Sequence, residues 1–350
     1  MGINTNNDWD PLEEIVVGTA DNARVPTLDL STRSFSYANY DLTLIEGLEG
    51  PTKQWIIDEA NEDLDGFSKV LESLGVKVRR PKSIDHSKKF SSPDWKTTGW
   101  YTYCPRDLLL PLSNLVIECP SPMRARQYET LAYRDVLYDA LEDGTEWISA
   151  PRPRLLDDNY QFYNLKEPTL LNKEIIFDAP NIVRMGRDLL YQVSNSGNLL
   201  GFKWLKTILE PRGYRLHLSE GLYSYAHFDS TIIPLRPGLV LFNADRVKKD
   251  NYPTIFKNWD KIFFEGVVDI GTNLPNGVSP CSSAIGLNFL SINENLIICD
   301  ENQEALRTEL SQYNIESIGL PLRQARTLSG GFHCVTLDTK RKGELEDYFA

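Results

Sequence analysis

The stretch IIFDAPNIVRMGRDLLYQVSNSGNLLGFKWLKTILEPRGYRLHL, residues 175–218, contains three apolar segments and one amphipathic segment in a fixed order. Residues 175–194 predict a β-hairpin that turns near Gly186. The apolar spacing of residues 197–209 is typical of a helix, and residues 214–218 are the next extended segment. The stretch therefore predicts a strand-strand-helix-strand unit.

The same unit recurs on both sides of this stretch. Upstream, strands at 13–18 and 77–81 enclose a helix at 55–75, and a hairpin at 107–119 precedes a helix at 124–141 and a strand at 146–150. Downstream, hairpins are expected at 227–243 and 282–300, the second followed by a helix at 301–312 and strands at 315–320 and 332–338. About five units at intervals of about 50–70 residues predict a radially repeated α/β architecture. We expect one domain over residues 1–350, with the polar or Gly/Pro-rich segments 31–40, 83–95, 152–171 and 271–281 as lids and entrance walls.

Composition excludes several functional classes. Hydrophobic residues at 41% and charged residues at 25% indicate an ordinary globular protein, and a net charge of −12 argues against a nucleic-acid partner. No segment approaches the roughly 20 apolar residues of a membrane helix, and the first 20 residues lack the features of a signal peptide. We therefore expect no membrane association and a cytoplasmic location. Five cysteines without CxxC spacing predict neither a disulfide framework nor a structural metal site.

Residues at the starts of successive hairpins should converge near the axis of such a ring. Chemically reactive or polar side chains stand at these positions: Asp107, Asp178, His227, Asp229, Ser282, Ser283 and Cys334. A cysteine, a histidine and carboxylates together are what nucleophilic catalysis at an electrophilic carbon requires. Carboxylates also suit a planar cation with several N–H donors, and Arg246 is placed to grip a carboxylate.

Each of these residues also has a purely structural interpretation. Cys334 follows Gly330-Gly331, which lets the backbone approach a ligand closely, but free cysteines are commonly buried for packing alone. His227 has the alternative of a satisfied core histidine, and the aspartates that of turn caps. His333 is expected to be a poor base for Cys334, because neighbours on a strand point to opposite faces.

Five motifs, in their order and spacing, resemble those of the amidinotransferases over nearly the whole chain. They are Cys104-Pro105-Arg106-Asp107, Phe177-Asp178-Ala179, His227-Phe228-Asp229, Asn243-Ala244-Asp245-Arg246 and Gly330-Gly331-Phe332-His333-Cys334. The opening Trp9-Asp10-Pro11-Leu12-Glu13-Glu14 and Ser92-Pro93-Asp94-Trp95 are similar to the bacterial branch that contains the arginine:inosamine-phosphate enzyme. The resemblance implies the pentein fold, a five-bladed α/β propeller of ββαβ modules with pseudo-fivefold symmetry.

The resemblance also implies a ping-pong mechanism without a cofactor or metal. The Cys334 thiolate would attack the amidino carbon of L-arginine, His227 would protonate the departing amine of ornithine, and Asp178 would orient His227. An acceptor amine would then take the amidino group from sulfur. One alternative is an arginine deiminase or a dimethylarginine hydrolase on the same fold, which would use the same cysteine with water as the acceptor. A second alternative is a non-catalytic arginine-binding propeller.

The same resemblance assigns the remaining site residues. Asp107 and Asp229 would clasp the guanidinium, while Arg246 and Ser282, rather than Ser283, would hold the arginine carboxylate.

The segment Tyr223-Ser224-Tyr225-Ala226 is expected to set acceptor specificity, because Ser224 and Ala226 are smaller than their counterparts in glycine-using members. We expect a primary amine larger than glycine, such as an aminocyclitol phosphate, lysine or a polyketide-derived amine, and a setting in natural-product biosynthesis. A homodimer is compatible with these expectations.

Overall fold

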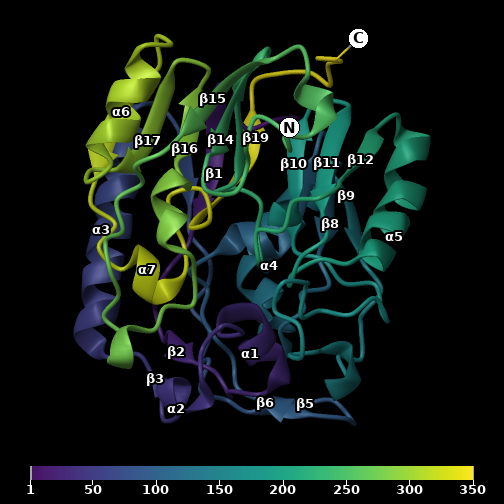
Figure 1. The fold of residues 1–350 in the computed structure, drawn as a ribbon, viewed down its shortest axis with the longest axis vertical. Helices are drawn as coiled ribbons and strands as arrows, with labels where there is room; N and C mark the ends of the chain where they lie inside the picture. Colours follow the sequence, from purple (N-terminus) through teal and green to yellow (C-terminus); the bar gives the residue numbers. More distant parts are fainter. Residues whose placement is uncertain (1, 350) are drawn as a thin grey trace.

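The computed structural model describes residues 2–349 (Figure 1). Over this range five three-stranded sheets share one pattern, in which the middle strand pairs antiparallel with one neighbour and parallel with the other. The sheets are β19 (Thr336–Arg341), β1 (Leu12–Val17) and β4 (Lys77–Arg79); β7 (Leu109–Leu112), β8 (Leu115–Glu118) and β9 (Glu146–Ser149); β10 (Ile182–Met185), β11 (Asp188–Gln192) and β12 (Arg215–Ser219); β13 (Ile232–Arg236), β14 (Leu239–Asn243) and β15 (Asp260–Phe264); and β16 (Leu290–Asn293), β17 (Leu296–Asp300) and β18 (Glu316–Leu320).

A helix joins the middle strand to the parallel strand in four of these modules. These helices are α3 (Gln54–Ser73), α4 (Arg134–Glu142), α5 (Leu199–Leu209) and α6 (Glu304–Ser311). Each is amphipathic and buries one face; in α3 that face includes Leu64, Phe67 and Leu71. Between β14 and β15 the described chain has only the short 3₁₀-helix η7 (Thr254–Phe256). Pro253 directly precedes it and, because proline lacks an N–H, disfavours extension of this helix toward the N-terminus.

Hydrophobic clusters join neighbouring sheets in a cyclic order. Residues from β1 pack with β16 and β17, and residues from β7 and β8 pack both with β1 and β19 and with β10 and β11. The clusters continue from β10 and β11 to β13 and β14, and from there to β17. The sheet that contains β1 and β19 unites the two ends of the chain, which lie at the same end of the molecule (Figure 1). This arrangement confirms the five-module α/β propeller.

Short elements cover the other end of the molecule in Figure 1. They are α1 (Leu30–Ser36), α2 (Leu42–Ile45), the pair β2 (Arg24–Val25) and β3 (Gly50–Pro51), and the pair β5 (Phe90–Ser91) and β6 (Lys96–Thr97). The helix α7 (Ala325–Leu328) precedes β19. The remaining 3₁₀-helices are η1 (Pro105–Asp107), η2 (Arg124–Arg126), η3 (Glu129–Tyr133), η4 (Asp157–Asn159), η5 (Ala179–Asn181), η6 (Glu210–Arg212), η8 (Pro275–Gly277) and η9 (Ser283–Leu287). None of the helices within residues 2–349 is long and apolar enough to span a bilayer.

Several predicted elements differ from the structure. The hairpins expected from residues 175, 227 and 282 begin only at Ile182, Ile232 and Leu290. The helix expected at 124–141 is helical in the α sense only from Arg134, because the buried side chains of Arg124 and Arg126 bind other parts of the fold and hold the preceding turns in 3₁₀ geometry. The strand expected from residue 332 begins only at Thr336. Residues 332–335, which were expected to start this strand, form a turn, in which the Val335 N–H donates to the Gly331 carbonyl.

Candidate active site

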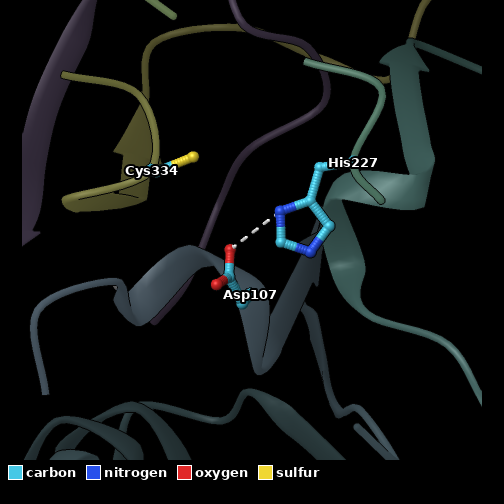
Figure 2. Close-up of side chains that lie close together, drawn as sticks. All are labelled: Asp107, His227 and Cys334. Carbon is cyan, nitrogen blue, oxygen red and sulfur yellow. Dashed lines mark ion pairs between the residues drawn. The ribbon is translucent and has the colours of Figure 1, made fainter. Parts of the chain in front are cut away.

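The predicted site residues stand where each module begins. Asp107 is in η1 before β7, Asp178 directly precedes η5 and β10, and His227 and Asp229 lie in the loop before β13. Cys334 lies in the turn before β19. Figure 2 shows Asp107, His227 and Cys334 facing one another from three separate segments. His227, Asp229 and Cys334 line a cavity of about 420 Å³ that residues 35–40 help to enclose.

His227 lies between two carboxylates. Its Nε2 is 3.1 Å from Asp178 Oδ2, and its Nδ1 is 3.6 Å from Asp107 Oδ1. Burial of the imidazole lowers its pKa, but the carboxylates of Asp107, Asp178 and Asp229 outweigh that effect and raise the pKa of His227 to about 9. The histidine is therefore a cation at neutral pH and holds a proton beside the thiol. Burial raises the pKa of Asp178 above its ordinary value.

Asp107 is held by a buried arginine. Arg126 Nη1 donates to Asp107 Oδ2 at 2.5 Å, while its Nε and Nη2 donate to the two oxygens of Glu129 at 2.8 and 2.7 Å. The second carboxylate oxygen of Asp107, Oδ1, has no hydrogen bond within residues 2–349 and faces His227. Arg126 thus fixes one oxygen of Asp107 and leaves the other available to a ligand.

Cys334 and His333 share one carboxylate. The Cys334 thiol donates to Asp229 Oδ2 at 3.3 Å, and His333 Nδ1 lies 2.8 Å from the same oxygen. The Cys334 N–H donates to Asn288 Oδ1 at 2.9 Å, which fixes the backbone of the turn. His333 and Cys334 lie in a turn, so the strand-alternation argument against His333 is wrong in its premise. His333 instead acts on Asp229.

The surroundings of Cys334 keep its thiol protonated. Burial is the largest cause that raises the pKa of Cys334 well above its usual value, and the carboxylates of Asp229 and Asp107 raise it further. Burial would also raise the pKa of Asp229, but its bond to His333 and the nearby charges lower it to about 2. A cation that arrived between these carboxylates would favour the thiolate, because it would offset their negative charge.

Arg246 lies at another part of the same cavity. Its Nη2 donates to Ser282 Oγ and its Nη1 to Thr231 Oγ1, each at 2.7 Å. No carboxylate within the described chain forms an ion pair with Arg246, and burial of its guanidinium lowers its pKa. Ser282 caps η9, whereas Ser283 is exposed and makes no bond to Arg246. The cavity therefore joins a thiol flanked by acids to an unpaired guanidinium.

Ser224, Tyr225 and Ala226 form part of the cavity wall, whereas Tyr223 does not line it. Ser224 Oγ donates to Gln192 Oε1 at 2.5 Å, and Gln192 Nε2 donates to the Ala226 carbonyl at 2.7 Å. Tyr225 has φ +64°, a conformation that is uncommon for a residue other than glycine, and its ring is about half exposed. Gln192 thus holds Ser224 and Ala226 in place beside His227.

The cluster also has the donor atoms of a metal site. One atom each from Asp107, His227 and Cys334 lie within 4.8 Å of one another, and nitrogen, oxygen and thiolate sulfur are ligands that Zn²⁺ accepts. A metal bound there would occupy the sulfur needed for nucleophilic attack. The orientation of His227 toward two carboxylates suits proton transfer as well as it suits metal binding.

Sequence reasoning did not identify Arg126, Glu129, Asn288 or His333 as parts of this site. Arg126 and Glu129 lie in a segment whose spacing resembles a helix, where charged residues are normally solvated. The one available signal for Arg126 was Asp107 itself. Its carboxylate is buried, and an isolated buried charge is costly, so it needs a cationic partner.

The modular ring and its axial cysteine, histidine and carboxylates define the class of pentein enzymes that act on guanidino groups. No protein-family model matches the chain. It is 44% identical over 347 residues to inosamine-phosphate amidinotransferase 1 of Streptomyces glaucescens, with 99% of both chains covered. It is 32% identical to the L-arginine:L-lysine amidinotransferase of Pseudomonas savastanoi pv. phaseolicola, over 97% of this chain and 95% of the relative. The chain belongs to the amidinotransferase family, and its activity is amidino transfer by a transferase.

Solved structures agree with this assignment. The inosamine-phosphate amidinotransferase of Streptomyces griseus superposes with a TM-score of 0.95 at 43% identity, covering 99% of both chains. SxtG of Microseira wollei, an amidinotransferase of the saxitoxin biosynthetic pathway, gives 0.89 at 34% identity and the same coverage. The dimethylarginine dimethylaminohydrolase of Pseudomonas aeruginosa gives 0.60 at 14% identity, covering 93% of this chain and 99% of its own, and shares the fold alone.

Proposed function

We propose that the chain is a single catalytic domain that transfers the amidino group of L-arginine through Cys334 to a primary amine larger than glycine, with release of ornithine, in natural-product biosynthesis. One observation carries the proposal. The wall of one cavity contains the Cys334 thiol, which lies near Asp107 and bonds to Asp229, and elsewhere Arg246, which forms no ion pair within residues 2–349. These groups complement the guanidinium and the carboxylate of L-arginine.

The first half-reaction begins when the substrate guanidinium enters between Asp107 and Asp229. Its positive charge offsets the two carboxylates that raise the pKa of Cys334, so the thiol releases its proton to solvent and the thiolate forms. The thiolate sulfur forms a bond to the amidino carbon, and the bond from that carbon to the ornithine nitrogen breaks. His227, a cation with a pKa of about 9, gives its proton to that nitrogen.

The second half-reaction reverses these roles. The lone pair of an acceptor amine attacks the amidino carbon on sulfur, the carbon–sulfur bond breaks, and the thiolate leaves. Neutral His227 takes the proton that the amine loses, and Asp178 at 3.1 Å stabilises the resulting imidazolium. Arginine and the amine thus give ornithine and a new guanidino compound with atoms and charges balanced.

The relatives support the setting in biosynthesis. One acts, by its name, on an inosamine phosphate, another on lysine, and a third belongs to the saxitoxin pathway. The small side chain of Ala226 and the bonded hydroxyl of Ser224 leave room beside His227 for an acceptor of that size.

Intact-mass spectrometry of the enzyme with L-arginine and no acceptor tests this function. We expect the mass of one amidino group to be added at Cys334, with one ornithine released per enzyme. Cys334→Ser should lose the adduct and ornithine release, because a hydroxyl of high pKa cannot replace the thiolate. Cys281→Ser, which changes the other thiol of the cavity wall, is the matched control and should retain both. An adduct at another cysteine, or multiple turnover to citrulline without an acceptor, would contradict the proposal.

A further inference from the structure

A second ion pair lies on the cavity wall, separate from the groups assigned above. Arg326 of α7 donates from Nη1 to Asp269 Oδ1 at 2.6 Å, and both residues line the cavity. The Arg326 side chain is buried and its Nε donates to Ser279 Oγ at 3.1 Å, whereas about half of the Asp269 side chain is exposed. The pair is therefore anchored on the arginine side and open on the aspartate side.

Each partner retains hydrogen-bonding capacity. Asp269 Oδ1 accepts from Arg326 and from the Gly271 N–H at 2.9 Å, while Oδ2 has no hydrogen-bond partner within residues 2–349. Arg326 Nη2 likewise donates to no group of the described chain. The pair thus presents one acceptor and one donor and carries no net charge.

Neighbouring wall residues add neutral polar groups. Ser36 Oγ is buried without a hydrogen bond in the described range, and the exposed side chains of Asn39 and Ser283 form none there. The half-exposed ring of Tyr225 adds an apolar face. All of these residues line the same cavity. Neutral donors and acceptors beside an aromatic ring are suited to a hydroxylated ligand rather than to an ion.

We infer that Asp269 and Arg326 form the acceptor subsite, and that the acceptor is an amine with neighbouring hydroxyl groups and no phosphate or carboxylate. Asp269 Oδ2 accepts from one hydroxyl while Arg326 Nη2 donates to the oxygen of the next. An anionic group at this pair would meet the Asp269 carboxylate, and the remaining polar groups of the wall beside it are neutral. The inference rests on the proposed function and concerns only its second half-reaction.

Discharge of preformed amidino-enzyme tests the subsite. The acceptors are scyllo-inosamine, its phosphate ester, cyclohexylamine as the same ring without hydroxyls, lysine, and hydroxylamine as an amine too small to reach the pair. Asp269→Asn should lower kcat/KM for scyllo-inosamine at least about tenfold. The same substitution should leave kcat/KM for hydroxylamine and for cyclohexylamine nearly unchanged. Each acceptor is compared with itself, so differences in amine pKa cancel. An asparagine can still accept from the Gly271 N–H, which preserves the loop.

Two further variants separate recognition from folding. Glu265→Gln replaces a carboxylate by an amide on the same loop but outside the cavity. It should leave kcat/KM unchanged for every acceptor. Arg326→Lys keeps the charge but removes Nη2. It should lower kcat/KM for scyllo-inosamine more than for hydroxylamine or cyclohexylamine. Equal losses with hydroxylamine and scyllo-inosamine, or a wild-type preference for the phosphate ester or lysine, would overturn the inference. Failure to form amidino-enzyme at all would instead overturn the proposed function.

Discussion

Arg246 is held in the cavity by hydroxyl groups rather than by carboxylates. It donates to Ser282 and Thr231 at 2.7 Å, and an incoming carboxylate would complete its charge-assisted bonds. Arg246→Ala should therefore raise the KM for arginine, since one such contact is typically worth about 1.5–3 kcal/mol. Steady-state kinetics and the yield of amidino-enzyme measure this change, and thermal denaturation should show a much smaller effect.

Agmatine, which lacks the carboxylate, supplies the control for Arg246. It should be a poor donor for the wild type and relatively less disfavoured in Arg246→Ala, because the missing contact is then absent for both donors. If the variant preferred arginine over agmatine by the same factor as the wild type, Arg246 would not bind the carboxylate.

The residues that belong to motifs were open to prediction, while those that support them were not. Asp107, His227 and Cys334 stand at the starts of repeated hairpins, so the repeat itself indicates that they converge. Arg126 reaches Asp107 from 19 residues away, and this contact depends on how a 3₁₀ segment folds back on the ring. The strand predicted at residues 332–338 would point His333 away from the thiol, but the turn that replaces it directs His333 to Asp229.

The loop before β13, which is expected to set acceptor size, is held in place by strand β11. Gln192 of β11 binds Ser224 and the Ala226 carbonyl, so the loop is fixed next to His227. Ala226→Met should fill space beside the histidine and lower transfer to the native acceptor at least about tenfold, roughly 1.4 kcal/mol. Formation of amidino-enzyme from arginine should be less affected.

The two half-reactions can be measured separately for Ala226→Met, by adduct formation and by its discharge with amine. Ala305→Met on the exposed face of α6 is the control for the substitution itself and should change neither rate. Equal losses in both half-reactions, or a wild-type preference for glycine over larger amines, would show that this loop does not set acceptor size.

Element boundaries were predictable where local pattern and tertiary packing agree. The buried face of α3 follows the periodicity of its own residues, whereas β10 and β11 are buried along their whole length. The segment Arg124–Arg126 has helical spacing but binds Asp107, Glu129 and Leu155 through buried arginines. Contacts with distant residues decide its conformation, and a local pattern contains no record of them.

At the scale of the whole molecule, a buried ionic cluster ties three modules together. Asp338 of β19 accepts from Arg341 at 2.8 Å and from Arg184 of β10 at 2.9 Å, and it pairs with Arg106 beside β7 at 2.8 Å. All four side chains are at least 95% buried. Arg106 also donates to the His333 carbonyl at 2.7 Å, so the cluster supports the turn that presents Cys334.

Removal of the Asp338 charge should therefore destabilise the whole ring. Asp338→Asn leaves buried Arg341 without a carboxylate and leaves Arg184 and Arg106 with Asp8 alone. The expected loss in the free energy of unfolding is about 3–5 kcal/mol. Burial alone would raise the pKa of Asp338, but Arg184, Arg106 and Arg341 hold it well below its usual value. Its contribution is thus complete above about pH 4 and declines as the pH falls through the folded-state pKa, so the variants are compared at pH 7.

Urea denaturation of Asp338→Asn and Asp139→Asn gives the measurement and its control. Asp139 also pairs with an arginine, Arg79 at 2.5 Å, but its side chain is 60% exposed. An exposed ion pair contributes roughly 0–1 kcal/mol because solvent screens it, so Asp139→Asn should have little effect. The difference between the two variants isolates burial from charge removal as the cause. Similar losses in both would mean that the cluster does not hold the modules together, and that the hydrophobic clusters between neighbouring sheets are sufficient to close the ring.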